Sequence, residues 1–183
     1  TCQYSELFKI DEALQIKADY DFAPQSHKHD FFENSYVVDE KKLAETVKKN
    51  NVAFRVGVNE HMYDELSDDV FEKTIQVICD TTNWLIETTP GLDMEILGCV
   101  LGNLKVLTKP SPNYGDYNMT KGLMCINTNI IESVAKKEGM SFDEKFTCLV
   151  SHETVHLVQG YCVDSIVDEK DVFYGTSYKF KAE

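Results

Sequence analysis

The sequence predicts a single α+β domain, because helical and strand patterns both occur along the chain and no internal repeat is present. Several segments carry apolar residues at the three- and four-residue spacing of an amphipathic helix, and shorter segments alternate as strands do. The chain has 183 residues, 43% of them hydrophobic, which is enough for one buried core. We therefore expect residues 1–183 to form one domain, in which residues 1–40 could be an N-terminal helical extension.

The N-terminal half predicts three helices and one strand. Residues 4–19 and residues 39–50 both have the apolar spacing of an amphipathic helix. Residues 52–58 alternate in the manner of a strand. Ser67 is a candidate N-cap for a long helix that runs to about Glu87. The predicted buried side of this helix consists of Val70, Phe71, Ile75, Ile78, Trp84 and Leu85.

The middle of the chain is predicted to be extended and then to form a loop. A turn at 89–91 precedes residues 95–107, which favour a strand that Gly98 and Gly102 interrupt. Residues 109–121 contain prolines and a glycine and are typical of an exposed loop.

Three further elements are predicted before the C-terminal segment. Residues 122–127 indicate a short strand, and residues 129–137 a helix that stops at Gly139. A capping box of Ser141 and Glu144 then marks the start of a mostly buried helix from about 142 to 159. Gly160 is a plausible terminator of that helix.

The last of these helices carries the strongest chemical signal in the sequence. His152, Glu153 and His156 form the pattern H-E-x-x-H. Residues four apart lie on one face of a helix, so the two imidazoles can bind one zinc ion, and Glu153 can act on a water at that ion. Chance alone produces such a pattern in a chain of this composition on the order of one time in a hundred. The alternative is a buried helix with two structural histidines.

A catalytic zinc site needs a third protein ligand, and no histidine follows His156. Gln159 and Cys162 stand where an extended H-E-x-x-H-x-x-G-x-x-H pattern would have glycine and histidine. The candidates are therefore carboxylates near the C-terminus, unless the ligand comes from outside this chain. They are Asp164, Asp168, Glu169, Asp171 and Glu183.

Asp171 begins a D-x-x-Y-G pattern that ends in Tyr174 and Gly175. Together with H-E-x-x-H, this pattern resembles the deuterolysin family of aspzincin metallopeptidases over roughly residues 110 to 178. That family has Gly-Thr where this chain has Asp168-Glu169. The resemblance implies a zincin-like catalytic domain, with a mixed sheet, an edge strand above the cleft, a long backing helix and an H-E-x-x-H active-site helix.

The resemblance also assigns roles to residues. It implies Zn²⁺ as cofactor, with His152, His156 and Asp171 as metal ligands. Glu153 would be the general base and Tyr174 a donor to the oxyanion. Two alternatives stay open for these assignments: Glu169, Asp168 or Asp164 could be the third ligand, and Tyr174 could be an ordinary packing residue.

The implied function is a zinc-dependent endopeptidase that hydrolyses peptide bonds through a zinc-activated water, with Glu153 as general base. Its partner would be a protein or peptide substrate, and we expect a monomer. One alternative is a zincin-fold binding or effector protein that acts on one specific partner with little general protease activity. Another is a globular domain without metal that contains the motif by accident.

Composition bounds the remaining possibilities. The net charge of −13 argues against nucleic-acid binding, because phosphates would be repelled. No run of apolar residues is long enough to span a membrane. Six cysteines and a glycosylation sequon at Asn118 favour a secreted protein with disulfide bonds, although buried thiols in a reduced compartment are the alternative. Cys148, four residues before His152, could be a metal ligand but is more typical of packing or a disulfide.

Overall fold

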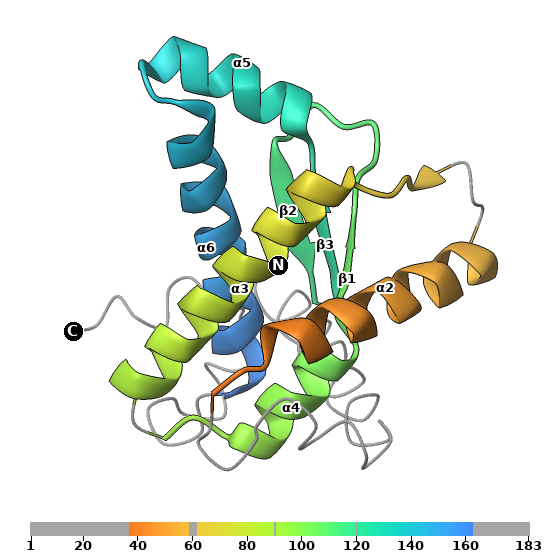
Figure 1. The fold of residues 1–183 in the computed structure, drawn as a ribbon, viewed down its shortest axis with the longest axis vertical. Helices are drawn as coiled ribbons and strands as arrows, with labels where there is room; N and C mark the ends of the chain where they lie inside the picture. Colours follow the sequence, from red (N-terminus) through yellow and green to blue (C-terminus); the bar gives the residue numbers. More distant parts are fainter. Residues whose placement is uncertain (1–36, 59–61, 90, 120, 163–183) are drawn as a thin grey trace, which may run out of the picture.

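The computed structural model describes residues 37–58, 62–89, 91–119 and 121–162. The predicted helix at 4–19 and the proposed N-terminal extension lie outside the described residues, apart from the last residues of that extension. Within the described part, the fold is mixed α+β, with five helices and one small sheet (Figure 1). The elements, in chain order, are α2 (Glu40–Gly57), α3 (Asp68–Thr88), α4 (Met94–Gly102), β1 (Lys105–Leu107), β2 (Gly115–Asn118), β3 (Leu123–Ile126), α5 (Thr128–Glu138) and α6 (Phe142–Cys162).

The three-stranded sheet has the order β1-β3-β2 and contains both kinds of strand pairing. β1 runs parallel to the central strand β3, with Val106 opposite Met124. β2 runs antiparallel to β3, with Tyr117 opposite Met124. A parallel pair needs a crossover, whereas the antiparallel pair closes through a short hairpin in which Gly122 adopts a φ of 60°. β2 is consequently an edge strand of a mixed sheet.

The helices are distributed around the sheet so that α6 lies at its β2 side and α2 at its β1 side (Figure 1). Helix α3 packs along α6, and α5 and α4 also contact α6. The main core lies between these helices and one face of the sheet, and it includes Phe146, Val150 and Leu157 of α6. A smaller apolar cluster covers the other face; it consists of Tyr63, Leu107, Leu123 and Cys125.

The outer edge of β1 is closed by side-chain and backbone groups from the N-terminal part. The side-chain amide of Asn51 donates to the carbonyl of Val106 at 3.0 Å and accepts from its N–H at 2.9 Å. Farther along, Asp64 and Thr108 form an isolated antiparallel bridge. An exposed strand edge invites pairing with another chain, and these contacts remove that possibility at β1.

Two predicted strands are wrong. Residues 52–58 continue helix α2 as far as Gly57, with Asn51 buried and Val52 and Val56 exposed. Adding residues to a helix that has already formed costs little free energy. The longer helix also places Asn51 against β1. The alternating pattern therefore does not decide the structure. Most of segment 95–107 is helix α4, with only Lys105–Leu107 in a strand. A short, fully buried apolar run has no periodicity that separates helix from strand.

Three smaller predictions also need correction. The predicted loop 109–121 contains the edge strand β2. Helix α6 continues through Gly160 to Cys162 instead of ending before that glycine. Trp84, expected on the buried side of α3, is 58% exposed. The strand at Leu123–Ile126 and helix α5, which ends at Gly139 in the left-handed conformation with φ of 70°, confirm the sequence-based expectations.

Candidate metal centre

Helix α6 begins with the predicted capping box. The backbone N–H and the hydroxyl of Ser141 both donate to the Glu144 carboxylate at 2.8 Å, and the N–H of Glu144 donates to the Ser141 hydroxyl at 3.2 Å. These contacts satisfy backbone donors that a helix start otherwise leaves free. They also hold the pKa of Glu144 below its usual value, because the carboxylate accepts hydrogen bonds from Ser141.

Helix α3 lies beside α6 and supports it near the motif. The Thr81 hydroxyl donates to the hydroxyl of Ser151 at 3.2 Å, directly before His152. At the start of α6, Lys73 forms an ion pair with Asp143. These two contacts lie eight residues apart on both helices, so α3 and α6 run in the same direction. The long helix α3 therefore packs along the helix that carries the motif.

The two motif histidines lie against each other on the outer side of α6. Their Nε2 atoms are 2.9 Å apart, and the ring centroids are 4.5 Å apart. Two imidazole nitrogens bound to one tetrahedral zinc ion lie about 3.3 Å apart, given zinc–nitrogen distances of about 2.0–2.1 Å. The arrangement is therefore close to that of two ligands of one ion. Without metal, one ring can donate to the other, depending on the tautomers.

The protonation of His156 suits this role. Burial, and secondarily the nearby charge of His152, lowers the pKa of His156 below its usual value. A lower pKa keeps the imidazole neutral, and the neutral form is the one that binds a metal. His152 is exposed and His156 is partly buried, so the pair is accessible from solvent on one side.

Glu153 lies on the inner side of the same helix turn and is only 8% exposed. Burial raises the pKa of its carboxyl group, the charge of His152 lowers it, and the charge of Asp116 raises it further. The backbone N–H of Tyr117, in the edge strand β2, donates a hydrogen bond to the carboxylate. A buried carboxylate close to His152 is thus tied to the edge strand β2.

β2 can reach Glu153 because the strand packs closely against α6. A Cβ atom on Gly115 would lie 2.8 Å from Cδ2 of Leu149 and 3.0 Å from the carbonyl oxygen of Cys125. Glycine at this position lets the strand approach the helix without displacing either neighbour. Sequence reasoning missed β2 and its two contacts, because the four residues Gly-Asp-Tyr-Asn are too short and too polar to resemble a strand. The glycine between polar neighbours was the only available signal.

The remaining predicted site residues lie in a part of the chain that the structure does not describe. Asp171 and Tyr174 lie outside the described residues, as do the alternative ligands Asp164, Asp168 and Glu169, together with Glu183. Within the described ranges, no group of three or more His, Cys, Asp or Glu side chains is placed to hold a metal ion. The exposed Cys148 therefore does not complete a three-residue group with the two histidines.

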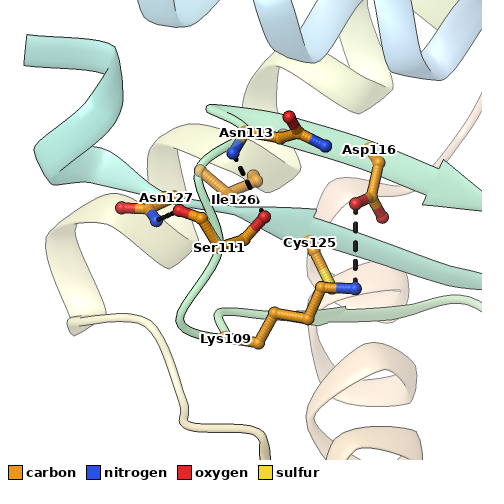
Figure 2. Close-up of a pocket in the computed structure, with 8 residues that line it drawn as sticks. Lys109, Ser111, Asn113, Asp116, Cys125, Ile126 and Asn127 are labelled. Carbon is orange, nitrogen blue, oxygen red and sulfur yellow. Dashed lines mark hydrogen bonds and ion pairs between the residues drawn. The ribbon is translucent and has the colours of Figure 1, made fainter.

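A second concave feature lies where β2 begins and β3 ends, at the end of the sheet opposite the hairpin, and none of the motif residues belongs to it. Figure 2 shows Lys109 reaching toward Asp116, with Nζ and Oδ2 3.8 Å apart. The amide of Asn127 donates to the carbonyl of Ser111 at 2.9 Å and holds the loop against the strand. This crevice leaves no space for a water molecule.

The cysteines and the helices bear on two further expectations. In the ranges that the structure covers, no two cysteine side chains form a disulfide. Burial raises the pKa of Cys79 to about 12 and that of Cys125 to about 11. The side chains of Cys2 and Cys162 lie outside the described part, so disulfide bonding stays a prediction.

None of the described helices is long and apolar enough to cross a membrane.

Comparison with protein-family models, with curated proteins and with solved structures gives no match for this chain. The resemblance to deuterolysin-like metallopeptidases therefore stays a prediction that rests on the motif residues.

Proposed function

We propose that this protein is a zinc-dependent peptidase of the zincin type whose centre is built on helix α6. One observation carries the proposal: two imidazole Nε2 atoms lie 2.9 Å apart on the outer side of the helix, and the buried carboxylate of Glu153 lies close to His152. Two neutral nitrogen donors and an adjacent base are the groups that metal-assisted hydrolysis requires. The antiparallel edge strand beside the motif supports the zincin type.

Each residue of the motif has a chemical task in this proposal. His152 and His156 would hold the metal through Nε2, and Asp171 would complete the protein ligands. When bound, zinc acts as a Lewis acid and makes a water molecule nucleophilic near neutral pH. Glu153 accepts the proton of the attacking water on a carboxylate oxygen and delivers it to the leaving amine nitrogen. Tyr174 would donate its hydroxyl hydrogen bond to the oxyanion.

Burial gives Glu153 the properties of a general base. A raised pKa makes the carboxylate a stronger proton acceptor, and exclusion of bulk water keeps the transferred proton within the site. A fully exposed glutamate would bind the proton less strongly. The combination of a buried base and an accessible imidazole pair therefore favours hydrolysis over simple metal storage.

The experiment uses the full chain purified in the presence of zinc. We expect about one zinc ion per chain and cleavage of casein that a chelator stops. Glu153→Gln should keep zinc and lose cleavage by at least about 100-fold, because the amide cannot accept the proton. Glu87→Gln, an exposed glutamate of α3, is the matched control and should cleave normally. Equal rates for the wild type and Glu153→Gln would refute the mechanism.

Metal content separates the proposal from its alternatives. If the chain binds zinc tightly and cleaves neither casein nor a peptide library, the zincin-fold binding or effector protein becomes the better description. If no zinc is bound and added zinc leaves the unfolding temperature unchanged, the motif is structural. Zinc affinity of Asp171→Ala, compared with Asp168→Ala and Glu169→Ala, identifies the third ligand, because loss of a direct ligand should weaken binding most among the three.

A further inference from the structure

The outer edge of β2 carries two residues whose backbone groups point away from the sheet. The N–H of Asn127 donates to the carbonyl of Tyr114 at 2.9 Å, which marks this pair as a hydrogen-bonded one in the antiparallel ladder. Bonded and non-bonded pairs alternate, so Asp116 is the next residue bonded to β3. Gly115 and Tyr117 therefore direct their N–H and C=O groups outward, toward the side on which α6 lies.

The outward N–H of Tyr117 has a partner, the Glu153 carboxylate. One step back along both elements, Gly115 packs against Leu149. The two contacts are separated by two residues of strand, about 6.6 Å, and by four residues of helix, about 6.0 Å. Because the two rises match, β2 and α6 run in register through the motif. The hydrogen bond is thus part of an extended contact and not an isolated one.

We propose that the backbone N–H of Tyr117 is a positioning group for the base, because it holds one oxygen of the Glu153 carboxylate and leaves the other facing the two imidazoles. This inference rests on the proposed peptidase activity. A glutamate carboxylate rotates freely about its last torsion unless a partner holds it. A charge-assisted hydrogen bond from a backbone donor restricts that rotation, and the donor itself has no side-chain freedom to lose. The edge strand therefore orients the base.

The hydrogen bond can be tested without metal or activity. Amide hydrogen exchange of the metal-free full chain should show protection of the Tyr117 N–H, although this group points out of the sheet. Glu153→Ala should accelerate exchange at Tyr117 by at least about tenfold, the loss expected for a hydrogen bond to a charged group. The Asp116 N–H, which faces β3, is the internal control and should not change. Equal exchange at Tyr117 in the wild type and in Glu153→Ala would overturn the proposal.

The positioning role needs a change that removes only the N–H. Replacement of Tyr117 by its α-hydroxy acid turns the amide into an ester and keeps the side chain. We expect kcat to fall about 10- to 100-fold while KM changes less than about threefold and zinc affinity is unchanged. The same ester at Tyr114 is the matched control. Its N–H lies on the β3 side, so it should leave kcat near the wild-type value.

The outcomes separate this inference from the proposed function. An active wild type whose Tyr117 ester keeps full kcat overturns the positioning role and leaves the peptidase proposal intact. A wild type that cleaves no protein refutes the peptidase proposal and the positioning role together, even if the exchange experiment shows the hydrogen bond. Selective loss of kcat in the Tyr117 ester, with the Tyr114 ester active, supports both.

Discussion

The side-chain amide of Asn51 forms two hydrogen bonds with the backbone of Val106, one to its carbonyl and one from its N–H. The amide supplies the hydrogen bonds that a neighbouring strand would otherwise make, so a helix side chain covers this edge of the sheet. The other edge is β2, next to the motif. The sheet is thus closed at β1 and meets helix α6 at β2. The neighbouring residue Asn50 adds to the contacts on the β1 side, because its side-chain amide donates to the carbonyls of Gly102 and Leu104 at 2.8 and 3.0 Å.

Replacement of Asn51 by alanine should therefore destabilise the fold strongly. Both backbone groups of Val106 would be buried without partners, which costs about 2–4 kcal/mol of unfolding free energy in total. Urea unfolding of the full chain measures the loss. Asn129→Ala, at an exposed position of α5, is the control and should stay within about 0.5 kcal/mol of the wild type. A loss below about 1 kcal/mol for Asn51→Ala would mean that water replaces the amide.

The Gly115–Leu149 contact should behave as a coupled pair. Gly115→Ala places a methyl group 2.8 Å from Leu149, which should cost about 1–3 kcal/mol, because the core around Leu149 must shift. Leu149→Ala leaves a cavity and should cost about 2–5 kcal/mol. The double variant should lose less than the sum, by about 1 kcal/mol or more, since each change relieves the other.

The control for this pair is Gly57→Ala. No atom lies within 4 Å of a Cβ placed on Gly57, and the residue belongs to helix α2. Alanine is the better helix former there, so the unfolding free energy should stay the same or rise. Strict additivity of the Gly115 and Leu149 variants would show that β2 and α6 do not touch in solution.

The capping box predicts a pH-dependent contribution to stability. The folded-state pKa of Glu144 is lowered, so its stabilising effect is fully present above the unfolded pKa of about 4.3 and is lost as the pH falls through the folded value. Wild type should therefore exceed Glu144→Gln in unfolding free energy near pH 6, and the difference should shrink below about pH 4. Chemical unfolding at a series of pH values measures this. A difference that is constant down to pH 2 would exclude a role for the ionised carboxylate.

The described cysteines should differ sharply in reactivity. With a pKa of about 12, Cys79 is ionised in about one molecule in ten thousand at pH 8, and it is also buried. Cys148 is exposed. After mild reduction of the folded protein, an alkylating reagent should therefore modify Cys148 at least about 100-fold faster than Cys79 or Cys125, as measured by peptide mass mapping. Comparable rates at all three positions would mean that the core opens readily.

Local signals in the sequence were sufficient for several elements. Ser141 and Glu144 predict the start of α6 correctly, and Gly139 the end of α5, because a cap depends only on residues within one turn. The relation of His152 to His156 is equally local, since four residues span one helical turn. The roles of Asp171 and Tyr174 stay predictions.

The errors arose where distant contacts decide the conformation. Residues 52–58 alternate like a strand, yet they continue α2. The extended helix is held at the edge of β1, where Asn51 accepts a hydrogen bond from the backbone of Val106. Helix α4 is apolar on all sides, and such a run favours helix or strand only according to what surrounds it. Trp84 has the helical spacing of a buried residue, but α3 directs it to solvent.

The sequence by itself determined the chemistry of this protein: two imidazoles and a carboxylate in the order H-E-x-x-H, on a helix with its own cap. Only the tertiary structure decided what surrounds that chemistry. The four-residue strand β2 has no helical or strand periodicity, and its position depends on pairing with β3 and on packing against Leu149. That position buries Glu153 and supplies the backbone donor from Tyr117. Spacing along one helix is a local property, whereas burial and partners come from segments far apart in the chain.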